Sequence, residues 1–296
     1  MICKLIDTVR AATTRFDRLA RLCEDHAIVS ESIHALTTVS NIDIDCAPAW
    51  HKLDLKRSQG VIYFNGGQEY CWLHDLKLPL VIKSESVHEI DIQDVYGFAA
   101  SKSLLSNYET TDAMICQPNR RNMIRTISNE ALLDALSWHE IRILHSPDGG
   151  GDRLHYFEYL ERYFLANTGG SHHFAAAKYI AKKLGESVTI KGKTLSYQIN
   201  PMAVEELNRN YRGILITTEE LPAFEIRKQL QKQRVRYFHL SFNQCGWTSN
   251  WHLFLYPNNS RLSGRAYQVM KQYGGIDLTS VLHRLLNVQK QQRLRI

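Results

Sequence analysis

Helix-like and strand-like spacings of hydrophobic residues alternate along this chain. Apolar positions at Leu5, Val9 and Leu19, separated by arginines, predict an N-terminal amphipathic helix that packs against the rest of the protein. The stretch GVIYFNGGQEYCWL follows, with strand-forming residues on both sides of Asn65-Gly66-Gly67, which is the signal for a tight hairpin. Further strands are predicted in LPLVIK and IDIQDVYGFAAS.

Helices become more frequent after residue 127. Ser128 is a good N-cap for a helix through Leu136. The stretch EIRILH predicts a short strand, and RLHYFEYLERYFLAN predicts two strands that turn near Leu160-Glu161. The clearest helix is HHFAAAKYIAKKLG, because alanine is the best helix former and Gly185 is a natural stop. SVTIKGKTLSYQI predicts a strand pair that turns at Gly192. The remainder predicts the strands GILIT, RVRYFHLSF and WHLFLYP and the helices PAFEIRKQLQKQ, SGRAYQVMKQY and LTSVLHRLL.

These elements predict an α+β fold with a mixed sheet, arranged in two regions. Residues 1–127 form an N-terminal α+β region to which no motif assigns a role. Residues 128–296 form an α/β domain that carries the most distinctive motif of the chain.

The composition is ordinary for a globular protein, with 44% hydrophobic and 22% charged residues. No window approaches about eighteen uncharged apolar residues, so we expect no membrane span. Six cysteines without a C-x-x-C pair argue against a zinc ribbon and against a dense disulfide framework. Reduced thiols, and an N-terminus unlike a secretory signal, predict a cytoplasmic protein.

Two glycines, a serine and two histidines stand directly before the clearest helix, in FLANTGGSHHFAAAKYIAKKLG. The first N–H groups of a helix have no partner within it, and the helix dipole adds positive charge there. Gly169 and Gly170 let a phosphate approach the backbone, and Ser171 suits the N-cap or can bind a ligand oxygen. His172 and His173 can donate to an anion or move a proton near neutral pH. A phosphate site is therefore predicted here, although a capped helix after a tight turn has the same sequence.

We call residues 169–173, GGSHH, the box. The order of elements around the box resembles the ParB/sulfiredoxin-like superfamily over about residues 128–200. In that superfamily a helix and a strand precede a hairpin that ends in a Gly-x-His-Arg box, and the box opens an alanine-rich helix. Gly170 matches the box glycine and His172 its histidine, while Ala176 and Ala177 match the small helix positions that pack on the sheet. The segment is also similar to part of a bacterial and phage protein family of unassigned function.

The resemblance implies a nucleotide ligand, ATP or CTP, bound with Mg²⁺. Gly169 stands where the superfamily has Asp, with Asn167 close by as a ligand contact, and His173 stands where it has Arg. An imidazole cannot replace a guanidinium on phosphate, so the cation must come from elsewhere, with Arg153 as the candidate. Arg142 and Arg162 are the alternatives to Arg153.

The first hypothesis is a nucleotide-binding enzyme or switch, with phosphotransfer or hydrolysis as its reaction if it is an enzyme. His172, His173 and Glu158 are the candidate acid–base residues, and a carboxylate could also hold Mg²⁺. Nothing in the sequence selects Glu158 over the nearby carboxylates Asp148, Asp152 and Glu161.

Two other chemistries use the same residues. A metal site would need histidines such as His145, His155 and His172 to converge, but no H-x-x-x-H spacing occurs. Neighbouring histidines on a helix also point about 100° apart. Ser171 as a nucleophile lacks a G-x-S-x-G elbow. Metal ligands therefore stay unassigned.

Basic residues supply a second hypothesis. The net charge is +6, and Lys232, Arg234 and Arg236 stand in its densest cluster. Such a cluster suits the phosphates of nucleic acid, whereas a solvated helix face is the simpler alternative. The second hypothesis is therefore a nucleic-acid-binding or nucleic-acid-processing protein. A third is a non-enzymatic interaction protein in which the box survives only as structure.

Overall fold

The computed structural model describes residues 16–24, 33–64, 67–146, 150–218, 220–245 and 250–293. The chain divides into two compact units, each assembled from separate segments. Unit 1 comprises Met1–Leu36, Lys52–Leu80 and Asn200–Leu286, and unit 2 comprises Thr37–His51, Val81–Ile199 and Asn287–Ile296. This division does not coincide with the regions 1–127 and 128–296, because strands from both halves of the chain pair within each sheet.

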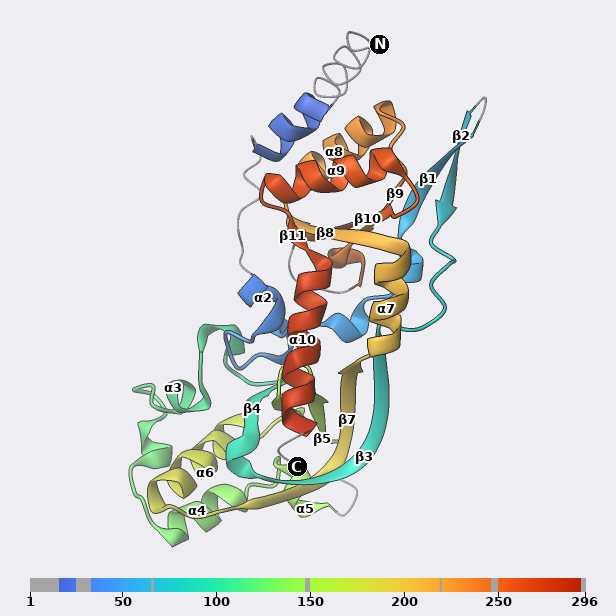
Figure 1. Ribbon diagram of the computed structural model, residues 1–296. Helices are drawn as coiled ribbons and strands as arrows, with labels where there is room; N and C mark the ends of the chain where they lie inside the picture. The colour runs from blue at the N-terminus through green and yellow to red at the C-terminus, as the bar shows by residue number, and fades with distance from the viewer. Residues whose placement is uncertain are drawn as a thin grey trace, which may run out of the picture. The chain divides into compact units, whose positions relative to one another are not determined.

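Unit 1 is built on a six-stranded antiparallel sheet (Figure 1). In order across the sheet, its strands are β11 (Ile276–Asp277), β8 (Tyr211–Thr217), β10 (Trp251–Pro257), β9 (Tyr237–Ser241), β1 (Gln59–Phe64) and β2 (Gly67–Trp72). The predicted hairpin is confirmed, since β1 and β2 pair along their whole length. Its turn residues Asn65 and Gly66 lie outside the described residues. Strand β1 also pairs with β9, which joins the hairpin to the C-terminal strands.

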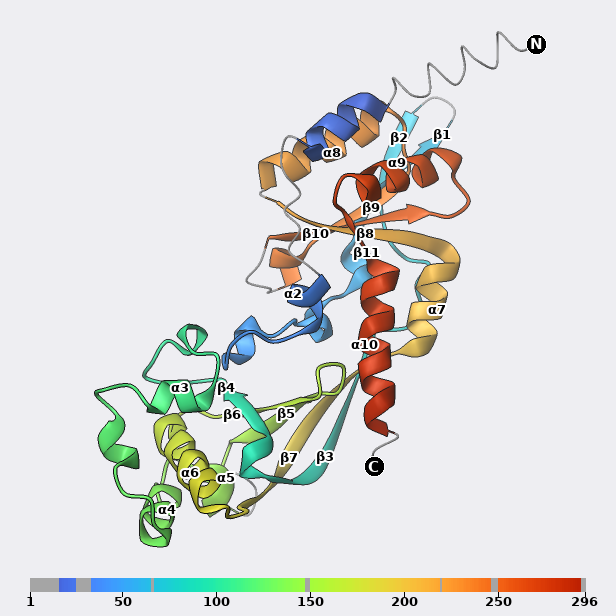
Figure 2. The same cartoon turned by 60° about the vertical axis from the view of Figure 1, so that its left-hand side comes forward.

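Helices lie on both faces of this sheet (Figure 2). They are residues 16–24, α7 (Pro201–Asn210), α8 (Glu220–Lys232), α9 (Arg261–Gln272) and most of α10 (Leu278–Arg293). Residues 16–24, α8 and α9 bury Leu19, Ile226 and Met270 in one core with Ile214 and Phe254 of the sheet. The described part of the N-terminal helix therefore packs against its own unit, as expected. Helix α7 lies on the opposite face.

Unit 2 contains a five-stranded mixed sheet. In order, its strands are β3 (Val81–Asp91), β7 (Thr189–Ile199), β5 (Arg153–Phe157), β6 (Arg162–Ala166) and β4 (Val95–Phe98). Strands β7 and β5, and β6 and β4, run parallel, and the other pairs are antiparallel. The turn predicted at Leu160-Glu161 is confirmed, and Glu161 adopts a φ of 53° there.

Two predicted elements of unit 2 are wrong. SVTIKGKTLSYQI forms the single strand β7, because eleven residue pairs with β3 keep it extended through Gly192. A Cβ at Gly192 would lie 2.7 Å from Ile143, so close packing explains this glycine. EIRILH is not a strand, since Arg142–His145 forms a short helix whose first N–H donates to Asp152 Oδ2 at 3.0 Å.

Helices pack on one face of the mixed sheet. They are α3 (Thr111–Ile115), α4 (Asn129–Leu136), α5 (Arg142–His145) and α6 (Ser171–Leu184), with α4 and α6 in contact. Ser128 caps α4 as predicted, accepting from Ala131 N–H at 3.3 Å. Helix α6 buries Phe174 and four alanines in one core with Leu154 and Leu165. The small alanine side chains allow this helix to approach the sheet closely.

Short turns complete the described chain. They are α2 (Ile33–Thr37), η1 (Ile44–Cys46), η2 (Trp50–Lys52), η3 (Leu55–Arg57), η4 (Ile92–Asp94), η5 (Leu105–Asn107), η6 (Arg121–Ile124) and η7 (Phe242–Cys245). The fold is therefore a mixture of helices and sheets, as the sequence predicts. Within the described ranges, no helix is both long and apolar enough to cross a membrane.

Candidate functional site

Helix α6 begins at a glycine turn. Its N-cap is Gly170, in the left-handed region with a φ of 75°, and not Ser171 as predicted. A Cβ at Gly170 would lie 2.9 Å from the carbonyl of Glu140, so the position excludes a side chain on two grounds. Ser171 is instead the first helical residue and is 3% exposed.

A carboxylate of the chain itself lies at this turn. Gly170 N–H donates to Oε2 of Glu140 at 3.1 Å, and the Trp138 indole N–H donates to the same oxygen at 3.0 Å. A Cβ at Gly169 would lie 3.1 Å from the Glu140 carboxyl carbon, which explains the second glycine. The hydrogen bond from Trp138 holds the pKa of Glu140 below its ordinary value, and the hydrogen bond from Gly170 and the positive charge of Lys102 add to this effect. The glycine turn therefore already holds an anionic oxygen.

His172 belongs to a chain of polar groups. Its Nε2 lies 2.9 Å from Ser103 Oγ, and Arg120 Nη2 donates to that Oγ at 2.5 Å. Because a guanidinium only donates, Ser103 accepts from Arg120 and has its own proton to give to His172. Burial, and then the charges of Arg120, His173 and Lys102, lower the pKa of His172. The ring is therefore neutral near pH 7, with Nε2 as acceptor and the ring proton on Nδ1.

His173 points elsewhere. Its ring stacks on Trp138, with centroids 4.0 Å apart and an interplanar angle of 4°. Burial lowers its pKa, while the charges of Asp134 and Glu140 partly oppose that shift. The two histidines diverge, as their spacing on a helix predicts. Across the described part of the chain, no three His, Cys, Asp or Glu side chains are grouped to hold a metal ion.

These groups line one cavity of about 360 Å³. The residues of the box, 169–173, form one wall with Thr168 and Glu140, and Lys102 and Arg120 bring two cations from the segments after β4 and α3. The first N–H groups of α6 add positive potential, because the helix itself gives them no acceptor. The cavity thus combines three sources of positive charge with one carboxylate.

Asn167 positions the turn and has no amide hydrogen left for a ligand. Its Nδ2 donates to the carbonyls of Ala100 and Gly169, at 3.2 and 2.6 Å, and its Oδ1 accepts from Ala100 N–H at 3.3 Å. The side chain is 4% exposed. Arg142, an alternative cation, donates to Thr168 Oγ1, and its Nη1 lies 3.6 Å from Asp152 Oδ1. Its guanidinium group therefore stabilises the glycine turn.

Arg153 and Glu158 are not brought to the cavity. Arg153 alternates along β5 with Leu154, which packs in the core with α6, so it lies on the opposite face of the sheet. Glu158 lies in the hairpin turn, before the first residue of β6. The box follows the other end of this five-residue strand, which is about 16 Å long. Asp148 lies outside the described residues.

The basic cluster lies in unit 1. Lys232 ends α8, Arg234 follows it with a φ of 54°, and both side chains are exposed. Arg236 is half-buried and lines a different cavity, next to β2. The three side chains therefore do not share one pocket.

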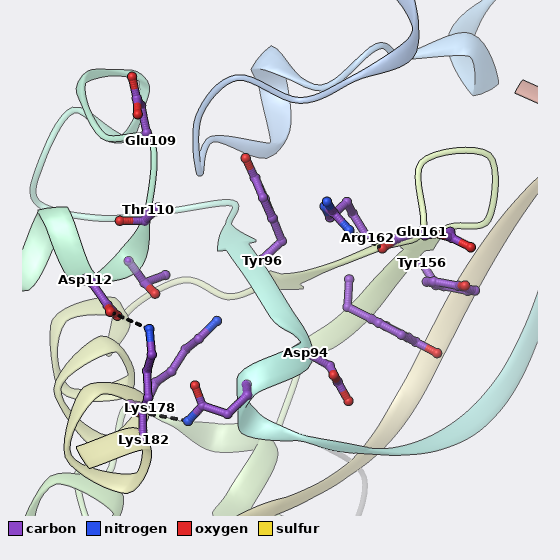
Figure 3. A pocket seen from close by; sticks show the side chains of 13 residues that line it. Asp94, Tyr96, Glu109, Thr110, Asp112, Tyr156, Glu161, Arg162, Lys178 and Lys182 are labelled. Atoms are coloured by element: carbon purple, nitrogen blue, oxygen red, sulfur yellow. Dashed lines mark hydrogen bonds and ion pairs between the residues drawn. The ribbon is translucent and has the colours of Figure 1, made fainter. Parts of the chain in front are cut away.

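A larger cavity of about 570 Å³ lies further along α6 (Figure 3). Lys178 reaches from α6 toward β4 and donates to the Val95 carbonyl, while Lys182 pairs with Asp112 at 3.0 Å. Burial lowers the pKa of Lys178 to about 8. Arg162, the remaining alternative cation, lines this cavity and not the one at the box.

Three charged residues of the box cavity could not be predicted from the sequence: Lys102, Arg120 and Glu140. Arg120 carried a weak signal, since it stands in the loop-like stretch QPNRRNM. Glu140 was hidden in a stretch that reads as a strand, and Lys102 has no local signal.

The chain belongs to DUF6685, a family of unknown function, which matches residues 85–294. The match extends from β3 into the last residues of the chain and so includes segments of both units. Searches of curated proteins and of solved structures found no match. Family membership assigns no activity to the cavity at the start of α6.

Proposed function

We propose that the cavity at the start of α6 binds a phosphate-bearing ligand, a nucleotide such as ATP or CTP with Mg²⁺. The observation that carries the proposal is that Lys102, Arg120 and the N-terminus of α6 line one cavity. Two cations and the N-terminus of a helix favour an anion. The Glu140 oxygen on Gly170 N–H supports the same preference. A volume of about 360 Å³ is at the small end of the range for ligand pockets.

Glu140 determines how a phosphate would enter. A carboxylate and a phosphate repel each other in one small cavity, and both need the N–H groups of the turn. In this proposal the ligand displaces Glu140 from Gly170, and Lys102 holds the phosphate at the exposed mouth.

His172 is the acid–base group of the proposal. In this proposal the water or hydroxyl group that attacks the phosphate replaces Ser103 at His172 Nε2, and the neutral imidazole accepts its proton there. This reaction would be hydrolysis or phosphotransfer. His172→Gln should then abolish turnover while nucleotide affinity changes little. Equal turnover in parent and variant would remove His172 from the reaction.

A ParB/sulfiredoxin-like core and a cytoplasmic location belong to the same proposal. The order of α4, the β5–β6 hairpin, the box and the alanine-rich α6 supports the resemblance, whereas α5 replaces the strand expected before the hairpin. Four described cysteines are free thiols, which supports a reducing compartment.

Calorimetric titration with MgATP and MgCTP tests the proposal. Lys102→Gln removes an exposed cation from the lining of the cavity, and should weaken binding about 10- to 100-fold. Lys193→Gln is the matched control, because Lys193 is exposed on β7 outside the cavity. Equal affinities of both variants and the parent would contradict the proposed site.

A further inference from the structure

Two grooves of unit 1 meet at the turn between β10 and α9. One groove, of about 1030 Å³, is lined by α9 and by the helix of residues 16–24. The other, of about 510 Å³, is lined by the end of β2 and the start of β8. Asn258 and Asn259 line both, so the grooves form one continuous surface. We call it the arginine groove after five lining residues: Arg209, Arg212, Arg236, Arg261 and Arg265.

Hydrogen bonds fix the segments that carry these arginines. Asn258 Nδ2 donates to the carbonyls of Asn208 and Arg209, both at 2.9 Å, and so ties the β10–α9 turn to the end of α7. Ser263 Oγ donates to the Arg236 carbonyl at 2.7 Å, which ties the first turn of α9 to the start of β9. The five guanidinium groups therefore extend from a well-defined backbone.

The groove has an excess of positive charge over the residues that the structure describes. None of the five arginines forms an ion pair with a carboxylate of the described chain. Asp17 and Asp75 are the carboxylates of the lining, and Asp75 already accepts from Tyr211 Oη at 3.0 Å. Five arginines and two aspartates give the lining a net charge of +3, with His74 counted as neutral.

Arg261 and Arg265 occupy positions that α9 itself disfavours. Arg261 is the first residue of the helix, where the dipole is positive. Arg265 follows four residues later on the same face, where like charges repel. A bound polyanion would remove both penalties. Such a local conflict is expected at a binding site.

Exposed aromatic rings adjoin the arginines. Trp72 lines the groove and is 48% exposed, and Tyr70, on the same face of β2, is 67% exposed. Strand β2 is an edge of the described sheet. Bases of a single-stranded nucleic acid stack on such rings while arginines hold the phosphates. An acidic peptide would use the arginines but has no need of the ring faces.

We infer that the arginine groove binds single-stranded nucleic acid. The phosphodiester backbone lies along the five arginines, and bases stack on Trp72 and Tyr70. This interaction is independent of the nucleotide site proposed for unit 2, because it uses none of the same residues.

Fluorescence anisotropy with a labelled oligothymidylate, measured over a range of salt concentrations, tests this inference. The logarithm of Kd should rise with the logarithm of the salt concentration, by about 0.7 per phosphate contact. The triple variant Arg212→Gln, Arg261→Gln, Arg265→Gln should bind at least about tenfold more weakly and lose about 2 units of slope. The matched control, Lys232→Gln with Arg234→Gln, removes exposed charges outside the groove and should bind like the parent.

Two further measurements keep the test decisive. If the triple variant melts early, the exposed single variants Arg209→Gln and Arg212→Gln replace it, and each should lower the slope by about 0.7. Trp72→Leu should weaken oligothymidylate binding and leave binding of an oligoglutamate of equal charge unchanged. Loss of binding in the control with retention in the groove variants would overturn the inference. Equal binding of both polyanions, with no effect of Trp72→Leu, would also overturn it and indicate an acidic protein partner.

Discussion

Lys178 should make the stability of unit 2 increase with pH. Its side chain is half-buried between α6 and β4 (Figure 3), and this burial lowers its pKa from 10.5 to about 8 although Asp112 is near. In the unfolded chain the pKa returns to the ordinary value of 10.5. Between these two values the unfolded state binds more protons than the folded state. By linkage, the free energy of unfolding therefore rises with pH through this window.

The size of the effect follows from the pKa difference. From 10.5 to about 8 is roughly 2.5 units, which corresponds to about 3 kcal/mol at 1.36 kcal/mol per unit. About 2 kcal/mol of this falls between about pH 8 and about pH 10. Lys178→Met keeps an unbranched side chain and removes the titrating group. The difference in unfolding free energy between parent and variant should change by that amount over this range. Loss of the hydrogen bond to Val95 changes the unfolding free energy of Lys178→Met by the same amount at every pH, so it does not affect how that free energy depends on pH.

Urea unfolding followed by circular dichroism at about pH 8, 9 and 10 measures this difference. The control is Lys182→Met, one turn further along α6. The pKa of Lys182 is raised by its bond to Asp112, so its contribution to stability is complete below about pH 10.5 and is lost above it. Parallel pH profiles for the parent and Lys178→Met would refute the burial argument.

The remaining predictions concern the glycine turn and buried polar groups. Gly170→Ala should lower the free energy of unfolding by about 1–3 kcal/mol, because its φ is 75° and Glu140 lies in the way. Gly151→Ala, at a φ of 94° but in open space, is the control. An equal loss of unfolding free energy in both variants would show that the contact with Glu140 does not destabilise Gly170→Ala. Asn167→Ala should lower the free energy of unfolding in urea by about 2–3 kcal/mol, because it leaves buried backbone groups unpaired. A loss below about 1 kcal/mol would contradict this. Burial lowers the pKa of His155 to about 4, so the parent should lose stability as the pH falls from about 6.5 to 4. His155→Phe should flatten that loss in urea unfolding, and an unchanged acid profile would count against a buried neutral ring.

Elements with strong local signals could be predicted from the sequence. Helix α6 covers Ser171–Leu184, as the run of alanines and the stop at Gly185 indicate. The β5–β6 hairpin follows in the same way from aromatic residues on both sides of a turn. These segments need no distant partner to choose their conformation.

Elements that depend on distant pairing could not be predicted. Gly192 reads locally as a turn, but pairing of β7 with β3 keeps the chain straight, and Ile143 fills the space beside it. In EIRILH, the local alternation predicts a strand, whereas Ile141 and Ile143 are both buried and Asp152 satisfies the first N–H of α5. Tertiary contacts override the local preference in both cases.

The same distinction applies to the candidate site. The glycines and histidines of the box are adjacent in sequence, so their role at a helix start could be predicted. Glu140 bonds to Gly170 across 30 positions, and Ser103 meets His172 across 69. No local pattern marks residues that join a site from such distances. The charge balance of the cavity therefore emerges only from the fold.

The most direct test of the proposed phosphate site is calorimetric titration of Glu140→Gln with MgATP and MgCTP, beside the parent. Glutamine keeps an oxygen that can accept from Gly170 and Trp138, and it removes the negative charge that competes with phosphate. We expect both proteins to bind one nucleotide, and Glu140→Gln to bind it more tightly than the parent. Absence of binding in both proteins would contradict it, and would show that Glu140 is the permanent cap of a purely structural turn.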